Sequence, residues 1–196
     1  MRRLLALVAA VAVCVGLAAA PASAQRVTGT DGSGDVGRLV EDRIDRTPRP
    51  AVDVETWAVR YGDHRISAVV GFRDLQPRGR RLETSLVLLH GADRGRSTEV
   101  SVLARRGDRA GTARVLGGKD CHPRHRIDYR RDLVRVSFAA RCIGSPRAFE
   151  ALIITKLVPA SGQALYADLV PATYPQLRSI VRSESFDYPT VRVRRG

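Results

Sequence analysis

From Val52 onward, apolar and polar residues alternate with a period of two, and this pattern constrains the fold more than any other feature of the sequence. Successive side chains of a β-strand point to opposite faces, so an alternating stretch buries one face and exposes the other. Residues 52–59 and 66–72 alternate on either side of a turn at 61–64 and predict a β-hairpin. The first strand of this hairpin is expected to place on one face Val52, Val54, Thr56 and Ala58. Further strands are expected at 82–89 (a central strand), around Val100 and Val102, around Ala113 and Val115, and at 133–141, 148–158 and 163–170.

Turn residues separate these stretches about every 8 to 12 residues, which is the spacing of a β-sandwich or a β-barrel. Short links favour antiparallel pairing, because parallel strands need long crossover connections. No long stretch has the 3.6-residue period of an amphipathic helix. The sequence therefore predicts an all-β protein, an antiparallel β-sandwich of about eight or nine strands with a jelly-roll or immunoglobulin-like arrangement.

The alternating region, 51–170, is the expected sandwich domain. It is preceded by a Gly/Asp/Arg-rich segment, 25–50, which we expect to be flexible. Within that segment, residues 36–46 are weakly compatible with one short helix. Residues 171–196 contain three prolines and are expected to form a loosely held C-terminal tail. The alternative for the tail is an edge strand at 190–194.

Residues 1–24 have the organisation of a secretory signal peptide. Arg2 and Arg3 precede an uncharged apolar run, residues 4–20, and Ala22-Ser23-Ala24 supplies the small-x-small site that signal peptidase reads. We expect cleavage after Ala24 and secretion of the remaining chain, with no transmembrane segment left. The alternative is a retained membrane anchor, for which a run of 17 apolar residues is short.

Removal of the signal peptide leaves two of the three cysteines, Cys121 and Cys142. An even pair in an exported chain predicts a disulfide bond, and two separate buried thiols are the alternative. The bridge would close a loop of roughly 20 residues, which corresponds to about 3 kcal/mol of stability in chain-entropy estimates.

The chain is strongly basic, with 33 Lys and Arg residues against 20 Asp and Glu residues and a net charge of +13. Cleavage removes two arginines and no acidic residue, so the charge falls by two, to +11. The positive electrostatic field of such a chain attracts anions, and outside a cell these include anionic cell-wall polymers and polysaccharides. A solvated surface is the alternative interpretation of each arginine cluster. Aromatic residues are 5% of the chain and no helix-turn-helix or zinc-finger pattern is present, so we expect no specific nucleic-acid binding.

Two small groups of residues are candidate binding sites. Trp57 and Tyr61 lie four residues apart on one expected strand face and could form an aromatic platform for a sugar or a cofactor; core packing is the alternative. His122 and His125, beside Asp120, could hold a transition metal. Neighbouring arginines disfavour a cation there, and a solvated loop is the alternative.

Part of the chain resembles a known group of proteins. The run from Cys121-His122-Pro123 through Ile127-Asp128-Tyr129 to Cys142-Ile143-Gly144-Ser145-Pro146, together with residues 66–75, is similar to a core shared by uncharacterised exported β-sandwich proteins of high-GC Gram-positive (actinobacterial) bacteria. The resemblance covers residues 51–158 and implies a disulfide-linked β-sandwich with a secretion signal, with no established activity. This chain has Ala139-Ala140 where the shared core has Pro-Arg.

A looser resemblance is to DOMON and family-9 carbohydrate-binding sandwiches, which implies a haem or a sugar ligand. Catalytic motifs are absent: the sequence has no G-x-S-x-G, no H-E-x-x-H, no P-loop and no G-x-G-x-x-G after an expected strand. We therefore expect no enzyme activity and no cofactor. The sequence predicts an exported, non-catalytic β-sandwich that interacts with the cell envelope or an anionic extracellular polymer. The alternative is a module that binds a small carbohydrate or cofactor.

Overall fold

The computed structural model describes residues 24–40, 43–47, 51–77, 79–91, 95–117, 121–162, 164–173, 175–178 and 189–196. Apart from Ala24, the expected signal peptide lies outside these residues. In this part of the chain, no helix has the length and apolar character needed to span a membrane.

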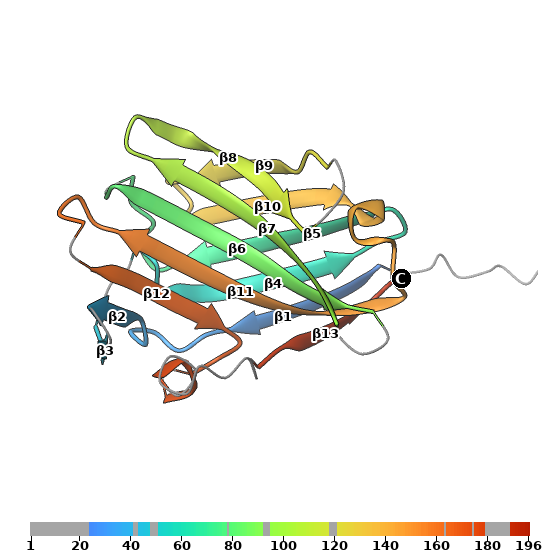
Figure 1. Cartoon of the computed structure of the whole chain (residues 1–196), viewed down its shortest axis with the longest axis horizontal. Coiled ribbons are helices and arrows are strands. Elements are labelled where there is room, and N and C mark those ends of the chain that lie inside the picture. The colour runs from blue at the N-terminus through green and yellow to red at the C-terminus, as the bar shows by residue number, and fades with distance from the viewer. Residues whose placement is uncertain are drawn as a thin grey trace, which may run out of the picture.

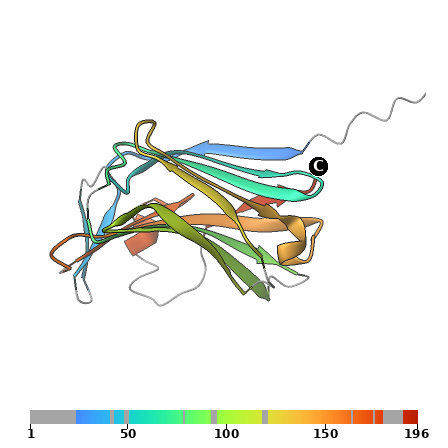
Figure 2. The same ribbon diagram turned by 90° about the horizontal axis from the view of Figure 1, so that it is seen from above.

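Two antiparallel sheets pack face to face as a β-sandwich (Figures 1 and 2). The five-stranded sheet contains, in spatial order, β1 (Gln25–Thr30), β4 (Val54–Tyr61), β5 (Arg65–Phe72), β10 (Leu133–Ala139) and β9 (Arg124–Asp128). The eight-stranded sheet contains β3 (Arg43–Arg46), β2 (Gly37–Val40), β12 (Leu165–Val170), β11 (Ala148–Val158), β6 (Arg81–His90), β7 (Arg96–Arg105) and β8 (Asp108–Leu116), with β13 (Val191–Arg194) paired to the start of β11. The expected all-β sandwich with antiparallel pairing is confirmed.

The structure contains more strands than the eight or nine expected. The segment 25–50 forms β1, β2 and β3, so the predictions of a flexible segment and of a short helix within it are wrong. The polar stretch after Cys121 forms the edge strand β9, and the tail contributes β13, as its alternative interpretation predicted. These strands are four to six residues long and are held by pairing with longer neighbours. Their own sequences carry too short an alternation to reveal them.

A β-bulge reverses the faces of β4. Val54 pairs with Phe72 but Thr56 pairs with Gly71, so β4 contains one extra residue at this point. Val54 points into the core before the bulge, and Trp57 does so after it, while Thr56 is exposed. The expectation that Thr56 shares a face with Val54 is therefore wrong, because the extra residue shifts the alternation by one position.

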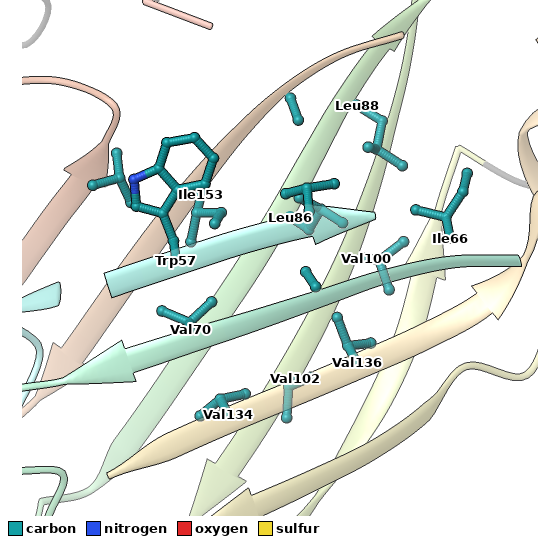
Figure 3. Close-up of a cluster of buried hydrophobic side chains, with 14 of the residues drawn as sticks. Trp57, Ile66, Val70, Leu86, Leu88, Val100, Val102, Val134, Val136 and Ile153 are labelled. Atoms are coloured by element: carbon teal, nitrogen blue, oxygen red, sulfur yellow. The ribbon is translucent and has the colours of Figure 1, made fainter. Parts of the chain in front are cut away.

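The main core lies between the two sheets. It includes Trp57, Ile66, Val70, Leu86, Leu88, Val100, Val102, Val134, Val136 and Ile153 (Figure 3). Burial of an aliphatic or aromatic side chain of this size stabilises the fold by about 1.5–3 kcal/mol. A smaller cluster contains Ile44, Leu152, Leu169, Ala172 and Leu177.

A disulfide bond between Cys121 and Cys142 is confirmed, with a Cα–Cα distance of 5.9 Å. It joins the start of the β9 region to the short 3-10 helix η1 (Ala140–Ile143), which follows β10. Tyr129 also donates a hydrogen bond from its hydroxyl to the carbonyl oxygen of Arg109, at 3.1 Å. The disulfide bond thus fixes the segment before β9 to the end of β10, whereas the Tyr129 hydrogen bond ties the β9 edge of the five-stranded sheet to the β8 edge of the eight-stranded sheet.

Candidate functional site

The arginines of the five-stranded sheet all lie on its outer face. Its five strands contain six arginines and no lysine, and every one of these arginines is exposed. They are Arg26, Arg60, Arg65, Arg124, Arg126 and Arg135. Alternation along each strand produces this separation, because the intervening residues point into the core. We call this surface the arginine face.

Strand register places five of the six arginines in two groups, and the sixth, Arg65, lies on β5 between them. Arg26 and Arg60 are partners on β1 and β4, at one side of the sheet. Arg126 and Arg135 are partners on β9 and β10, at the other side, and Arg124 lies two residues from Arg126 on β9. Neighbouring strands lie about 4.8 Å apart, so the outermost strands, β1 and β9, are roughly 19 Å apart, and the inner members of the two groups, on β4 and β10, are separated by two strand steps, or roughly 10 Å across the sheet.

Small side chains form the surface between the two groups. Ser67 pairs with Ser137 across β5 and β10, and Ala58 pairs with Val69 across β4 and β5. Nη2 of Arg65 donates a hydrogen bond to Oγ of Ser137 at 3.0 Å, which confirms that both side chains lie on this face. A shallow depression of about 310 Å³ lies over residues of β5, β9 and β10.

The arginine face contains few carboxylates. The acidic residues of its five strands are Glu55, at the β-bulge, and Asp128. Nη2 of Arg126 lies 3.4 Å from Oδ2 of Asp128, so one arginine is partly neutralised. The surface therefore has an excess of positive charge. Guanidinium groups bind phosphate, sulfate and carboxylate oxygens with charge-assisted hydrogen bonds, often two at a time.

A second group of charged residues, all aspartates, lies at the end of the sandwich where β1 continues into β2. Asp31 and Asp35 lie on the loop between these strands, and Asp168 lies on β12. One carboxylate oxygen from each of the three lies within 4.8 Å of the others. Asp35 and Asp168 are buried and Asp31 is half-buried. We call these three residues the aspartate cluster.

Neighbouring backbone amides hold two of the carboxylates in this region. Asp168 accepts hydrogen bonds from the amides of Val54 and Leu169, each at 2.8 Å. Asp53, which is fully buried, accepts from the amide of Gly34 at 2.9 Å and lies 3.6 Å from Nη1 of Arg73. Asp53 therefore anchors the loop that carries Asp31 and Asp35.

Burial and mutual repulsion disfavour the charged forms of these aspartates. Burial, with the charges of Asp168 and Asp35 adding to it, raises the pKa of Asp31 to about 8. Burial is also the main reason that the pKa of Asp168 rises to about 7, although its two backbone hydrogen bonds oppose the shift. The pKa of Asp35 is raised as well, chiefly by burial. The aspartate cluster is thus an oxygen-rich site whose negative charges need compensation.

The sequence analysis did not identify the aspartate cluster, because it treated residues 31–37 as flexible. Two signals were present. Asp31, Ser33 and Asp35 follow an Asp-x-Ser-x-Asp spacing, and Asp168 is an isolated acid in an apolar strand. The same loop contains a G-x-G-x-x-G motif after β1, Gly32-Ser33-Gly34-Asp35-Val36-Gly37, but this motif leads into β2 rather than into a helix. It therefore lacks the helix N-terminus on which a dinucleotide site depends.

The predicted aromatic platform is not at the surface. Trp57 has an exposed fraction of 7% and Tyr61 of 0%, and both belong to the core between the sheets. Figure 3 shows Trp57 among the buried side chains of this core. The ring of Tyr61 lies 5.2 Å from the ring of Phe149, and its hydroxyl donates a hydrogen bond to the carbonyl oxygen of Pro146 at 2.6 Å. The core-packing alternative describes these two residues correctly.

The two histidines of the predicted metal site lie in different local structures. His122 is exposed before β9, whereas His125 lies within β9 and is half-buried. Nε2 of His125 is 3.0 Å from the carbonyl oxygen of Gly111 and acts as a donor there, because a carbonyl cannot donate. That nitrogen holds β9 against β8 and is not free to bind a metal. Asp120 lies outside the described residues.

A further depression, of about 460 Å³, lies on the eight-stranded sheet next to Glu83. This carboxylate is buried and lies 2.5 Å from Nη2 of Arg81 and 3.9 Å from Nη2 of Arg114. Lys156 is its cross-strand partner on β11. Glu83 is thus a carboxylate surrounded by cations, and these contacts hold its side chain in place.

No protein-family model matches this chain, and no curated protein matches its sequence. The resemblance to exported actinobacterial proteins stays a prediction.

Proposed function

We propose that this protein is an exported, non-catalytic β-sandwich that binds an anionic polymer of the cell envelope or the extracellular space through its arginine face. The observation that carries the proposal is the exposure of all six arginines of the five-stranded sheet on one surface. A disulfide-linked fold suits an oxidising compartment outside the cytosol. Export itself rests on the expected signal peptide.

The layout of the arginine face favours a chain-like ligand over a single small anion. The arginines of the outermost strands, β1 and β9, are roughly 19 Å apart across the sheet, further than one phosphate or carboxylate group can reach. The surface between them carries Ser67, Ser137 and Val69, which leave room for an extended chain. A polymer with repeated anionic groups can contact both groups at once, and each arginine adds a modest contribution to binding.

Binding of the full chain to polyphosphate tests this proposal, with polygalacturonate as the carboxylate polymer and dextran as the neutral one. We expect binding to both anionic polymers, none to dextran, and a steep loss of affinity as salt rises, because the contacts are screened. The variant R124Q/R126Q/R135Q should weaken binding by about 10- to 100-fold at low salt, since exposed ionic contacts contribute roughly 0.5–1 kcal/mol each.

The matched control is R43Q/R96Q/R105Q, which removes the same charge from exposed positions on β3 and β7 of the eight-stranded sheet. We expect it to retain most of the wild-type affinity. An equal loss in both variants would assign binding to the net charge of the molecule and would overturn a specific role for the arginine face. Absence of binding to either anionic polymer at low salt would overturn the proposed function.

A further inference from the structure

The aspartate cluster lies where the chain passes from one sheet to the other. β1 belongs to the five-stranded sheet and β2 to the eight-stranded sheet, and the loop between them carries Asp31 and Asp35. Asp168 comes from β12, the neighbour of β2. Three carboxylates from distant parts of the sequence therefore converge at one point, with their nearest oxygens within 4.8 Å.

Two oxygens of this cluster have no hydrogen-bond donor. Asp35 has an exposed fraction of 6%, and its Oδ1 accepts no hydrogen bond from the described residues. Oδ2 of Asp31 is also buried and accepts none from them. A buried polar atom without a partner is costly, and native proteins normally satisfy it with a hydrogen bond, a water molecule or an ion. These two oxygens therefore require a positively charged or hydrogen-bonding partner.

Within the described residues, the charge of Arg46 acts on Asp35 from a distance, but no cationic side chain forms an ion pair with the cluster. The ion pair next to the cluster joins Arg73 to Asp53, and the carboxylates of Asp31, Asp35 and Asp168 form no ion pair with a described residue. Nε of Arg46 donates its hydrogen bond to the carbonyl oxygen of Gly34. In their charged forms, three carboxylates this near repel one another, and either a proton or a bound cation relieves the repulsion.

We propose that Asp31, Asp35 and Asp168 bind a divalent cation, Ca²⁺ in preference to Mg²⁺. All three ligands are hard carboxylate oxygens, which these cations favour over softer donors. Three oxygens spaced evenly around one ion lie about 4.0–4.5 Å apart when the bonds are about 2.3–2.6 Å long, as for Ca²⁺. The bonds of Mg²⁺, about 2.0–2.1 Å, bring them to about 3.5–3.6 Å, so Ca²⁺ tolerates the wider spacing that the limit of 4.8 Å allows.

The half-buried position of Asp31 leaves one side of the site open to solvent. Water can complete the coordination there, and the cation can enter without unfolding the chain. Once bound, it would join the β1–β2 loop to β12 and thus one sheet to the other. This role is independent of the arginine face and goes beyond the proposed function.

Terbium luminescence and thermal unfolding of the full chain test the site. Tb³⁺ is a Ca²⁺ surrogate whose emission is sensitised by a nearby indole, and the protein has one tryptophan, Trp57, which packs against Gly29, two residues before Asp31. We expect Tb³⁺ emission that saturates, that Ca²⁺ abolishes by competition, and that Mg²⁺ abolishes only at much higher concentration. Millimolar Ca²⁺ added to chelator-treated protein should raise the melting temperature in a saturable way.

The variant D35N separates ion binding from simple charge repulsion. It should weaken Ca²⁺ binding at least tenfold and melt above the wild type in chelator, because one repelling charge is gone. The control D63N, at an exposed turn, should respond to Ca²⁺ like the wild type. If D35N does not fold, Tb³⁺ emission of the wild type and its competition by Ca²⁺ still decide the question.

Two results would overturn the proposal. One is wild-type protein whose melting temperature and Tb³⁺ emission do not respond to millimolar cation. The other is D35N protein that binds Ca²⁺ as tightly as the wild type.

Discussion

Gly29 and Trp57 fit together so closely that a single methyl group should disturb the core. They are register partners on β1 and β4, and a Cβ atom built on Gly29 would lie 2.5 Å from Cε2 of the Trp57 indole. A carbon atom cannot occupy that position unless the indole or the strand moves. The bulge in β4 is what turns Trp57 toward the core.

We predict that G29A destabilises the protein by about 1–3 kcal/mol, the usual range for overpacking. Urea unfolding followed by the fluorescence of Trp57 measures the change. G95A is the matched control, because a Cβ on Gly95 meets no atom within 4 Å, and its stability should match the wild type. A G29A variant as stable as the wild type would mean that the indole has room to shift.

At the scale of single residues, the sequence predicted the disulfide bond but not the aspartate cluster. The Cys121–Cys142 bridge was predictable from the number of cysteines left in a chain that is expected to be exported. The aspartate cluster brings Asp31 next to Asp168, and nothing in either local sequence names the other as a partner. The bulge at Glu55 is one extra residue in β4, and it was enough to turn Trp57 and Tyr61 inward.

At the scale of elements, long alternating strands were predictable and short paired ones were not. The strand expected at 148–158 is β11 with the same bounds, and the strand expected at 82–89 is the central strand β6. β2, β3 and β9 are four or five residues long and owe their conformation to a neighbouring strand. A pattern that short cannot distinguish a strand from a loop, because pairing that is distant in sequence decides it.

β9 depends on the disulfide bond more than other strands do. It is an edge strand that pairs with β10 alone, and Cys121 lies three residues before it. We predict that C121S/C142S lowers the free energy of unfolding by about 3 kcal/mol, as expected for a loop of 21 residues. Chemical denaturation measures this loss, and reductant should destabilise the wild type but not the variant.

The same variant should lose amide protection unevenly. Hydrogen exchange under native conditions is expected to accelerate most in β9. Without the disulfide bond, this strand is held by its backbone pairing with β10 and by the hydrogen bonds of His125 and Tyr129. β6 and β11, with partners on both sides, serve as internal references. Uniform acceleration in all strands would show that the bridge acts only on global stability.

At the scale of the whole molecule, the disulfide bond and the aspartate cluster lie at opposite sides of the sandwich. The disulfide bond joins the segment before β9 to η1, and the aspartate cluster lies just after β1. β1 and β9 are four strand steps apart in the five-stranded sheet, a separation of roughly 19 Å. Sites this far apart without shared contacts usually contribute independently to stability.

We therefore predict that reductant and chelator act additively. Unfolding free energies measured with neither, either and both should combine to within about 0.5 kcal/mol. This test presupposes that the aspartate cluster binds Ca²⁺. If the chelator has no effect on stability, the result would contradict the proposed Ca²⁺ site rather than the additivity. A combined loss much larger than the separate losses would show that the two sides of the sandwich are coupled.

The edge strands of both sheets also affect how readily this protein aggregates. An exposed edge strand offers unpaired backbone groups to the edge of another molecule, which is a common route to aggregation. The four strands that end the two sheets are β1, β9, β3 and β8, and each of them carries at least one arginine. Two copies approaching edge to edge bring like charges together before any backbone hydrogen bond can form. The arginines for which we propose a role in anion binding should thus also keep neighbouring molecules apart, so that concentrated solutions of the protein remain clear.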